Sequence, residues 1–165
     1  MTATSDWWCS PPEVAGPLEQ FFNGPVGCDP CSNPRSIIRA RVAYTHGGLV
    51  LPWARTSYEN PPYSAAGAWT DKAISEMKSG TVRELVRLTM ASTSTAWWQR
   101  QCLVPRRNPR LIFTKRLKFI DPFAEDAGET RQGSRFEPVL TYFGPRVTEF
   151  EREFKSIAMW MGWGR

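Results

Sequence analysis

Long apolar segments and a secretion signal are both missing from this sequence of 165 residues. No run reaches the roughly 18 apolar residues that a transmembrane helix needs, so no membrane partner is expected. Residues 1–8 lack the basic start and the apolar stretch of a secretion signal. We therefore expect a cytoplasmic protein whose four cysteines are reduced thiols rather than a disulfide framework.

Histidine is nearly absent, which limits the catalytic and metal sites that the chain can build. His46 is the only histidine, so no Ser/His/Asp grouping is expected, and no Gly-x-x-x-x-Gly-Lys phosphate loop occurs. Cys28 and Cys31 have the spacing of a zinc or redox pair, but no second pair accompanies them. We expect buried thiols beside a strand and no bound metal, with structural zinc as the alternative.

Positive charge and tryptophan are abundant instead. The chain has 21 Lys and Arg against 16 Asp and Glu, and this balance favours polyanionic partners through counterion release. Its 8 tryptophans suggest flat stacking surfaces in addition to core packing. A solvated charged face and a phosphate-contacting surface are both open interpretations of the densest basic region. That region contains Arg106, Arg107, Arg110, Lys115, Arg116 and Lys118, and a later polar loop adds Arg131 and Arg135.

The spacing of apolar residues predicts alternating helices and strands. Helices are predicted at residues 13–22, 65–78, 95–103 and 147–159. Strands are predicted at residues 25–28, 37–44 (after a short helical turn), 56–59, 82–88, 110–114, 116–120 and 138–143, with a tight turn joining 110–114 to 116–120. Residues 1–12 and 121–137 are predicted to be loops, the second one flexible.

This order of elements predicts the class of fold. Alternation through residue 103 favours a mostly parallel sheet with helices on both faces, and the later strands favour antiparallel additions near the C-terminus. We therefore expect residues 1–165 to form a single three-layer α/β domain. Ligands of such sheets bind beyond the carboxyl ends of the strands.

The stretch Asn60-Pro61-Pro62-Tyr63-Ser64 follows one of these predicted strands directly. Two prolines cannot continue a central strand, so the strand must end there. The exocyclic amino group of adenine is a poor nucleophile, and the Asn60 side-chain oxygen and the Pro61 carbonyl can accept its two hydrogens. Tyr63 can stack on a base extruded from the duplex. The alternative is a rigid Pro-Pro turn with a packed tyrosine.

Several short motifs occur in a fixed order around this stretch. They are Asp6-Trp7-Trp8-Cys9-Ser10-Pro11, Cys28-Asp29-Pro30-Cys31, Gly47-Gly48-Leu49 with Trp53, Asn60 to Ser64, Trp97-Trp98, Arg116-Leu117-Lys118-Phe119 and Tyr142-Phe143-Gly144. In this order and spacing, the chain resembles the phage-type, Dam-like DNA N6-adenine methyltransferase family with its Asn-Pro-Pro-Tyr motif. The likeness extends over roughly residues 6–145.

The resemblance implies a Rossmann-like methyltransferase domain with S-adenosylmethionine as cofactor and DNA as partner. It implies methyl transfer to the adenine amino group with base flipping, in the host-cell cytoplasm if the protein is phage-encoded. The target base would be bound by Asn60, Pro61, Pro62 and Tyr63. The cofactor would be bound by Trp8, Ser10, Pro11, Asp29, Pro30, Cys31 and Asn60. DNA would be contacted by Ser64, Arg106, Arg107, Lys115, Arg116, Lys118, Arg131 and Arg135.

The sequence departs from the family pattern beside the cofactor. An acidic residue often precedes the Gly-Leu pair, but Gly47 stands there, and no Asp or Glu lies between Asp29 and Glu59. No carboxylate is therefore available after the second strand to bind the cofactor ribose. Two alternatives follow: a methyltransferase that acts on RNA or on a protein amide, and a non-catalytic DNA-binding protein whose cofactor site has decayed.

Overall fold

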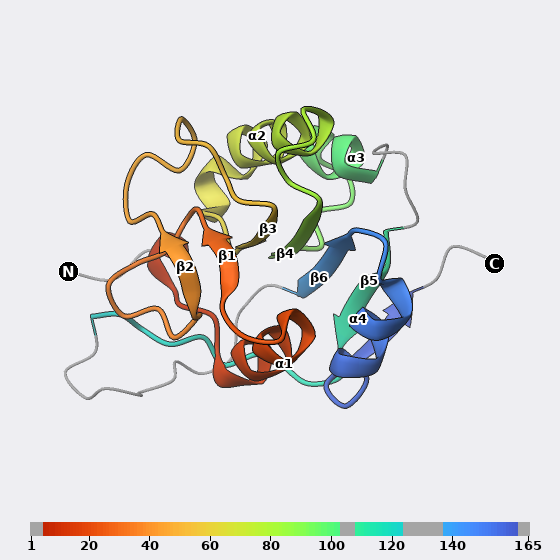
Figure 1. Ribbon diagram of the computed structural model, residues 1–165. Helices are drawn as coiled ribbons and strands as arrows, with labels where there is room; N and C mark the ends of the chain where they lie inside the picture. The colour runs from red at the N-terminus through yellow and green to blue at the C-terminus, as the bar shows by residue number, and fades with distance from the viewer. Residues whose placement is uncertain (1–4, 103–107, 124–136, 162–165) are drawn as a thin grey trace.

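The computed structural model describes residues 5–102, 108–123 and 137–161, which form a mixed α/β structure (Figure 1). The strands are β1 (Val26–Asp29), β2 (Ala40–Ala43), β3 (Thr56–Glu59), β4 (Glu84–Met90), β5 (Arg110–Phe113), β6 (Pro138–Phe143) and β7 (Ala158–Met161). The helices are α1 (Pro12–Phe22), α2 (Ala66–Lys78), α3 (Ala96–Cys102) and α4 (Val147–Phe154), with short 3-10 turns η1 (Ser5–Trp7) and η2 (Tyr63–Ala65).

The described strands form one seven-stranded sheet in the order β2-β1-β3-β4-β6-β5-β7. The three pairings among β2, β1, β3 and β4 are parallel, and the three pairings that add β6, β5 and β7 are antiparallel. The predicted antiparallel additions near the C-terminus are thus confirmed. Parallel pairings make up half of the sheet rather than most of it, and β7 occupies the place beside β5 that the sequence predicts for the strand at residues 116–120.

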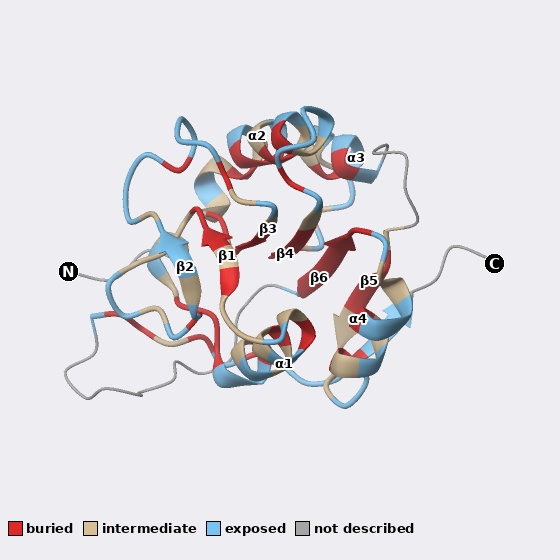
Figure 2. Cartoon of the chain, viewed as in Figure 1, coloured by how far each residue is buried: buried red, intermediate tan, exposed pale blue. Residues whose placement is uncertain are grey.

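Helices lie on both sides of the sheet: α2 and α3 on one side, α1 and α4 on the other (Figure 1). Successive side chains of a strand point to opposite faces, so β4 contributes Leu85 to the core under α2, and Val86 and Leu88 to the core over α1 and α4. The central strands β4 and β6 are therefore buried, whereas the edge strand β2 is largely exposed (Figure 2).

Helix α1 forms where the apolar spacing predicts it. Pro12 occupies the first turn, where its missing N–H costs no hydrogen bond. The helix continues through Pro17 and buries Val14, Leu18 and Phe21 against the sheet. It ends at Asn23, which adopts the left-handed conformation that caps helices, with φ 54°.

The Tyr142-Phe143-Gly144 motif ties β6 to its neighbours. The Tyr142 hydroxyl donates to the Glu84 carboxylate at 2.6 Å, and Arg146 donates to the same carboxylate at 2.9 Å. Arg146 also donates to the Phe21 carbonyl at 3.1 Å, which joins α1 to this group. A Cβ at Gly144 would lie 2.2 Å from the Tyr142 hydroxyl oxygen, so a side chain there would displace that ring. This motif therefore has a structural role.

One predicted strand is wrong, and the last predicted helix is too long. Among the described residues, the segment 116–120 makes one isolated bridge, from Ile120 to Cys9, and no pairing with β5, so the predicted hairpin does not form. Leu117 and Phe119 are buried in the core and alternate with the exposed Arg116 and Lys118. This alternation is typical of a half-buried strand, which explains the wrong prediction. The last helix ends at Phe154 instead of residue 159, and its expected final turn becomes β7, which pairs with β5.

Smaller differences concern element ends. The helical turn expected before β2 does not form, and the strand predicted at residues 82–88 lies two residues later, as β4. Most of the loop predicted at residues 121–137 lies outside the described residues.

Candidate active site

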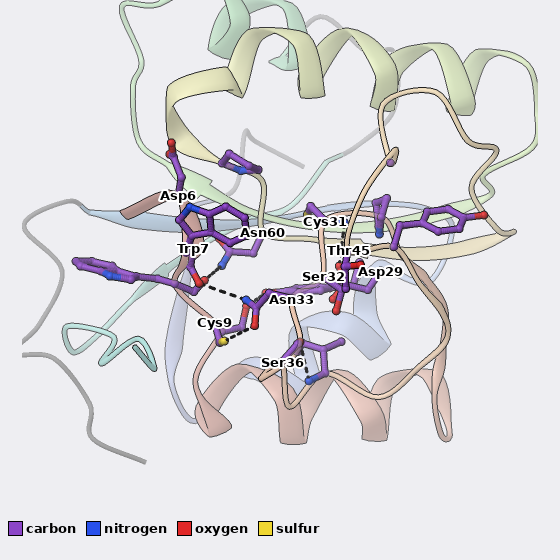
Figure 3. A pocket seen from close by; sticks show the side chains of 18 of the residues that line it. Asp6, Trp7, Cys9, Asp29, Cys31, Ser32, Asn33, Ser36, Thr45 and Asn60 are labelled. Carbon is purple, nitrogen blue, oxygen red and sulfur yellow. Dashed lines mark hydrogen bonds between the residues drawn. The ribbon is translucent and has the colours of Figure 1, made fainter. Parts of the chain in front are cut away.

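A pocket of about 270 Å³ opens at the carboxyl ends of β1, β2 and β3. These neighbouring parallel strands end at one edge of the sheet, which brings Asp29, Tyr44 and Asn60 to the same cavity. Residues 6–10 cross the opening and supply a further wall (Figure 3). The pocket thus lies where an α/β sheet places its ligand.

The Asn60 side chain is held in one orientation. Its Nδ2 donates to the Trp8 carbonyl at 3.0 Å (Figure 3). Because one end of the amide is engaged as a donor, Oδ1 is left as the acceptor at the pocket. No described residue donates a hydrogen bond to this oxygen. Asn60 therefore offers a preorganised acceptor to a bound molecule.

The rest of the Asn-Pro-Pro-Tyr motif is only partly at the pocket. Pro62 lines it, whereas Pro61 is buried and Tyr63 is half-buried beside it, outside the lining. Burial raises the pKa of the Tyr63 hydroxyl. The tyrosine ring is thus not part of the pocket wall.

Asp6 fixes the end of this motif. Its carboxylate accepts hydrogen bonds from the Ser64 backbone N–H at 3.0 Å and from the Ser64 hydroxyl at 2.6 Å. The Ser64 hydroxyl, expected to contact DNA, is therefore engaged within the protein. The sequence alone assigns Asp6 no such role, because its partner lies 58 residues away and nothing local signals the pairing.

Five of the residues expected at the cofactor line the pocket besides Asn60: Trp8, Ser10, Asp29, Pro30 and Cys31. Pro11 is buried next to it but does not line it. Asp29 is 4% exposed, and burial raises the pKa of its carboxyl to about 6, against the opposing effect of a hydrogen bond from the Cys31 backbone. The Ser10 hydroxyl lies 2.6 Å from the buried Tyr58 hydroxyl.

The wall after β2 is neutral. Thr45, His46, Gly47 and Gly48 line the pocket there, and the Thr45 hydroxyl lies 3.0 Å from the His46 Nδ1. Among the described residues that line the pocket, the acidic ones are Asp6 and Asp29. The carboxylate that the sequence lacks at this position is therefore not supplied by another described element.

Gly48 is packed too closely for any side chain. A Cβ there would lie 1.8 Å from the Pro30 carbonyl oxygen, and the Gly48 carbonyl accepts a hydrogen bond from the buried Trp53 indole at 2.8 Å. Trp53 in turn packs against Trp69. Gly48 and Trp53, from the Gly-Leu and Trp motifs, therefore fix the position of the wall after β2.

Gly48→Ala is therefore expected to weaken ligand binding in this pocket by at least tenfold, since the clash is with backbone and the wall must move. Titration calorimetry with S-adenosylmethionine, the cofactor that the resemblance to the methyltransferase family implies, tests this expectation. Gly16→Ala, on an open part of α1 with no atom near its Cβ position, is the matched control and should bind normally. Normal binding by Gly48→Ala would show that this wall does not contact the bound ligand.

A buried ion pair lies behind the pocket. Glu59, the residue before Asn60, is 2.6 Å from the Arg87 guanidinium, and both side chains are at most 1% exposed. Arg87 also donates to Gln101 at 3.0 Å and lies over the Trp97 ring. Burial raises the pKa of Glu59 to about 7, although the Arg87 charge opposes this shift. Trp98, the neighbour of Trp97, is buried in the protein.

The predicted DNA-contacting cations have different positions. Lys115, Arg116 and Lys118 are exposed. Arg110 is buried with its guanidinium over the Trp98 ring, so it belongs to the protein interior. The other four, Arg106, Arg107, Arg131 and Arg135, lie outside the described residues.

The cysteines give no metal site within the described residues. Cys9 and Cys28 are buried as free thiols, and burial raises the pKa of Cys28 to about 11. No group of three His, Cys, Asp or Glu residues lies together in the described part of the chain. In the same residues, no helix has the length and apolar character needed to cross a membrane.

One family model matches the chain. It describes DNA N-6-adenine-methyltransferase (Dam) and covers residues 1–157. No curated protein and no solved structure matches the chain. Because the match extends over nearly the whole sequence, including the pocket and the Asn60 loop, the chain belongs to the DNA N-6-adenine-methyltransferase (Dam) family.

Proposed function

We propose that this protein transfers a methyl group from S-adenosylmethionine to the exocyclic amino group of adenine in DNA. The observation that carries the proposal is the pocket itself, in which an oriented Asn60 amide and a buried Asp29 carboxylate meet at the ends of neighbouring strands. The family, described by DNA N6-adenine methylation, supports the same activity.

The residues at the β1 end of the pocket fit the cofactor. S-adenosylmethionine carries an ammonium group and a sulfonium that supplies an electrophilic methyl group. A buried carboxylate such as Asp29 is costly unless a cation accompanies it, which suits this chemistry. The Trp8 indole N–H is also buried without a partner and can donate to a polar group of the cofactor. Ser10, Pro30 and Cys31 complete this wall, and Pro11 supports it from behind.

The residues at the β3 end suit an adenine amino group. Asn60 Oδ1 and the Pro61 carbonyl would accept the two amino hydrogens and so localise the nitrogen lone pair for attack. The Trp8 carbonyl keeps Oδ1 directed at the pocket by holding Nδ2. An adenine can enter such a pocket only after leaving the base stack, so the proposal includes base flipping, with Pro62 and Tyr63 packing around the base.

The same proposal includes the domain architecture, the cellular location and the residues that contact DNA. We assign the helices on both faces of the sheet to a single Rossmann-like three-layer domain acting in the cytoplasm. Lys115, Arg116 and Lys118 would contact DNA phosphates, together with Arg106, Arg107, Arg131 and Arg135. The Ser64 hydroxyl would act through Asp6 rather than on DNA directly.

The test is methyl transfer from tritiated S-adenosylmethionine to three acceptors: adenine-containing DNA, RNA of the same sequence and a protein extract. We expect label in DNA, and digestion with mass spectrometry should show it as N6-methyladenine. Label only in RNA or protein would assign the chemistry to another substrate. No label combined with no cofactor binding by calorimetry would identify a binding protein that has lost the reaction.

The pH dependence of cofactor affinity should report Asp29. Burial raises the pKa of its carboxyl to about 6, so it is ionised above pH 6 and attracts the cationic cofactor there. Below pH 6 the carboxyl is protonated, and affinity should fall by about tenfold per pH unit. Calorimetry between pH 5 and 8 measures this dependence.

Asp29→Asn should bind weakly at every pH and show no such dependence, because the amide carries no charge. Asp71→Asn is the matched control. Asp71 is an exposed residue of α2 that forms an ion pair with Arg100 of α3, and it does not line the pocket. A steep pH profile that persists in Asp29→Asn would assign the titration to another group.

A further inference from the structure

Two large aromatic side chains are exposed beside the pocket: Trp7, which lines it, and Phe123, which contacts the Trp7 ring. Trp7 is 48% exposed and Phe123 is 61% exposed. Their rings meet edge to face, with centroids 6.2 Å apart and planes at 70°. Together these two residues form an aromatic clip. Exposed apolar surface of this size is costly in water, and next to a pocket it indicates a ligand.

The aromatic clip is held in place by its backbone. Cys9 and Ile120 exchange two backbone hydrogen bonds of 3.0 Å, which join the segment of Trp7 to the segment of Phe123. The Trp7 carbonyl accepts a hydrogen bond from the Asn33 side chain at 3.2 Å (Figure 3). The Phe123 backbone N–H donates to the Asp121 carboxylate at 2.9 Å. The two rings are therefore positioned before any ligand arrives.

The position of the clip relates it to the Asn60 end of the pocket. Trp7 lines the pocket with Asn60 and Pro62, and the residue after it, Trp8, orients the Asn60 amide. Tyr63 does not line the pocket, so Trp7 offers the exposed aromatic surface on this side. The segment that ends at Phe123 also carries the exposed cations Lys115, Arg116 and Lys118.

We propose that the aromatic clip of Trp7 and Phe123 stacks on a nucleobase displaced from the DNA duplex and holds it at the pocket mouth. This inference rests on the proposed function and adds a binding site for the base. A base has an aromatic face for the clip and polar edges for Asn60, and its backbone phosphates suit the neighbouring cations. An apolar protein partner would neither hydrogen-bond to the adjoining Asn60 amide nor neutralise the neighbouring cations.

Binding of a fluorescein-labelled duplex, measured by anisotropy, tests the site. Stacking contacts of this kind contribute enough that Trp7→Ala should weaken binding by about five- to 150-fold, and Phe123→Ala by a smaller factor. Trp7→Phe keeps a stacking face and should restore most of the affinity. Trp160→Ala is the matched control, because Trp160 is 46% exposed on β7, at the other edge of the sheet.

A second readout reports displacement of the base directly. The fluorescence of 2-aminopurine at the target adenine is quenched by stacking inside the duplex and rises when the base is displaced. Because Trp7→Ala lacks the ring that holds the displaced base, this rise on binding should be smaller with Trp7→Ala than with wild type. The circular dichroism spectrum and the thermal unfolding midpoint of Trp7→Ala should match those of wild type, which shows that the variant is folded.

The outcomes separate the inference from the proposed function. If wild type binds and methylates DNA but Trp7→Ala and Phe123→Ala behave like Trp160→Ala in both readouts, the clip is not a base site and the proposed function stands. If wild type neither binds nor methylates DNA, both are overturned. Loss of binding in the clip variants, with rescue by Trp7→Phe, supports the site.

Discussion

Asn60→Ala is expected to reduce the rate of methyl transfer to DNA by about 10²–10³-fold, the usual effect of removing one preorganised polar group from a reacting centre. The structure gives the physical reason. Nδ2 is engaged by the Trp8 carbonyl, so Oδ1 is already directed at the pocket and need not reorganise when the substrate binds. Alanine removes this acceptor and leaves the amino lone pair delocalised into the ring.

The rate is measured at saturating cofactor and DNA, so that a change in affinity does not hide a change in the chemical step. Asn23→Gly is the matched control, because Asn23 caps α1 with positive φ, far from the pocket, and glycine tolerates that conformation. If Asn60→Ala retained more than a tenth of the wild-type rate, the reaction would not depend on this side chain.

The location of Asn60 could be predicted because the signals that fix it are local. The strand predicted at residues 56–59 is β3 residue for residue. A pair of prolines cannot continue a strand, and the carboxyl ends of parallel strands share one edge of the sheet. These two rules are enough to bring Asp29 and Asn60 to one pocket from the order of residues alone.

The contacts that orient Asn60 could not be predicted in the same way. The bond from Asn60 to Trp8 spans 52 residues, and the pair of bonds from Ser64 to Asp6 spans 58. No periodicity or spacing encodes such a pairing, which exists only once the N-terminal segment crosses the ends of β1 and β3. The structure also brings Trp7 into the pocket lining, a position that the sequence does not reveal, while Tyr63 lies outside the lining.

The C-terminal error has a related cause. Strand β7 has four residues, and it follows α4 after a turn of three residues. Its strand conformation depends on pairing with β5, a non-local partner. Amphipathic spacing continues through this region, so the sequence favours one long helix. The last residues form a strand instead because they pair with the edge of β5.

Arg87→Met is expected to lower the free energy of unfolding by about 3–5 kcal/mol, because it leaves the Glu59 carboxylate buried without its counterion. The variant also loses the bond to Gln101. Burial already raises the pKa of Glu59 to about 7, and loss of the Arg87 charge must raise this pKa further. The unfolded carboxyl ionises at its ordinary, lower pKa, so wild type and Arg87→Met should lose stability in parallel up to about pH 7, and the stability deficit should grow above that pH, where only the wild-type carboxyl is ionised in the folded state. Urea unfolding at several pH values measures both effects.

The double variant Glu59→Gln with Arg87→Met separates the charge from its position. Removing both charges should recover much of the lost stability, since replacing a whole buried ion pair is often close to neutral. The deficit should then no longer grow above pH 7, because residue 59 no longer ionises. Glu59 is the last residue of β3 and directly precedes Asn60, so the pair also anchors the strand end that presents the acceptor oxygen. If the double variant is as stable as wild type yet methylates slowly with unchanged cofactor affinity, the ion pair positions Asn60 for the reaction. If its methylation rate is also normal, the pair serves the fold alone.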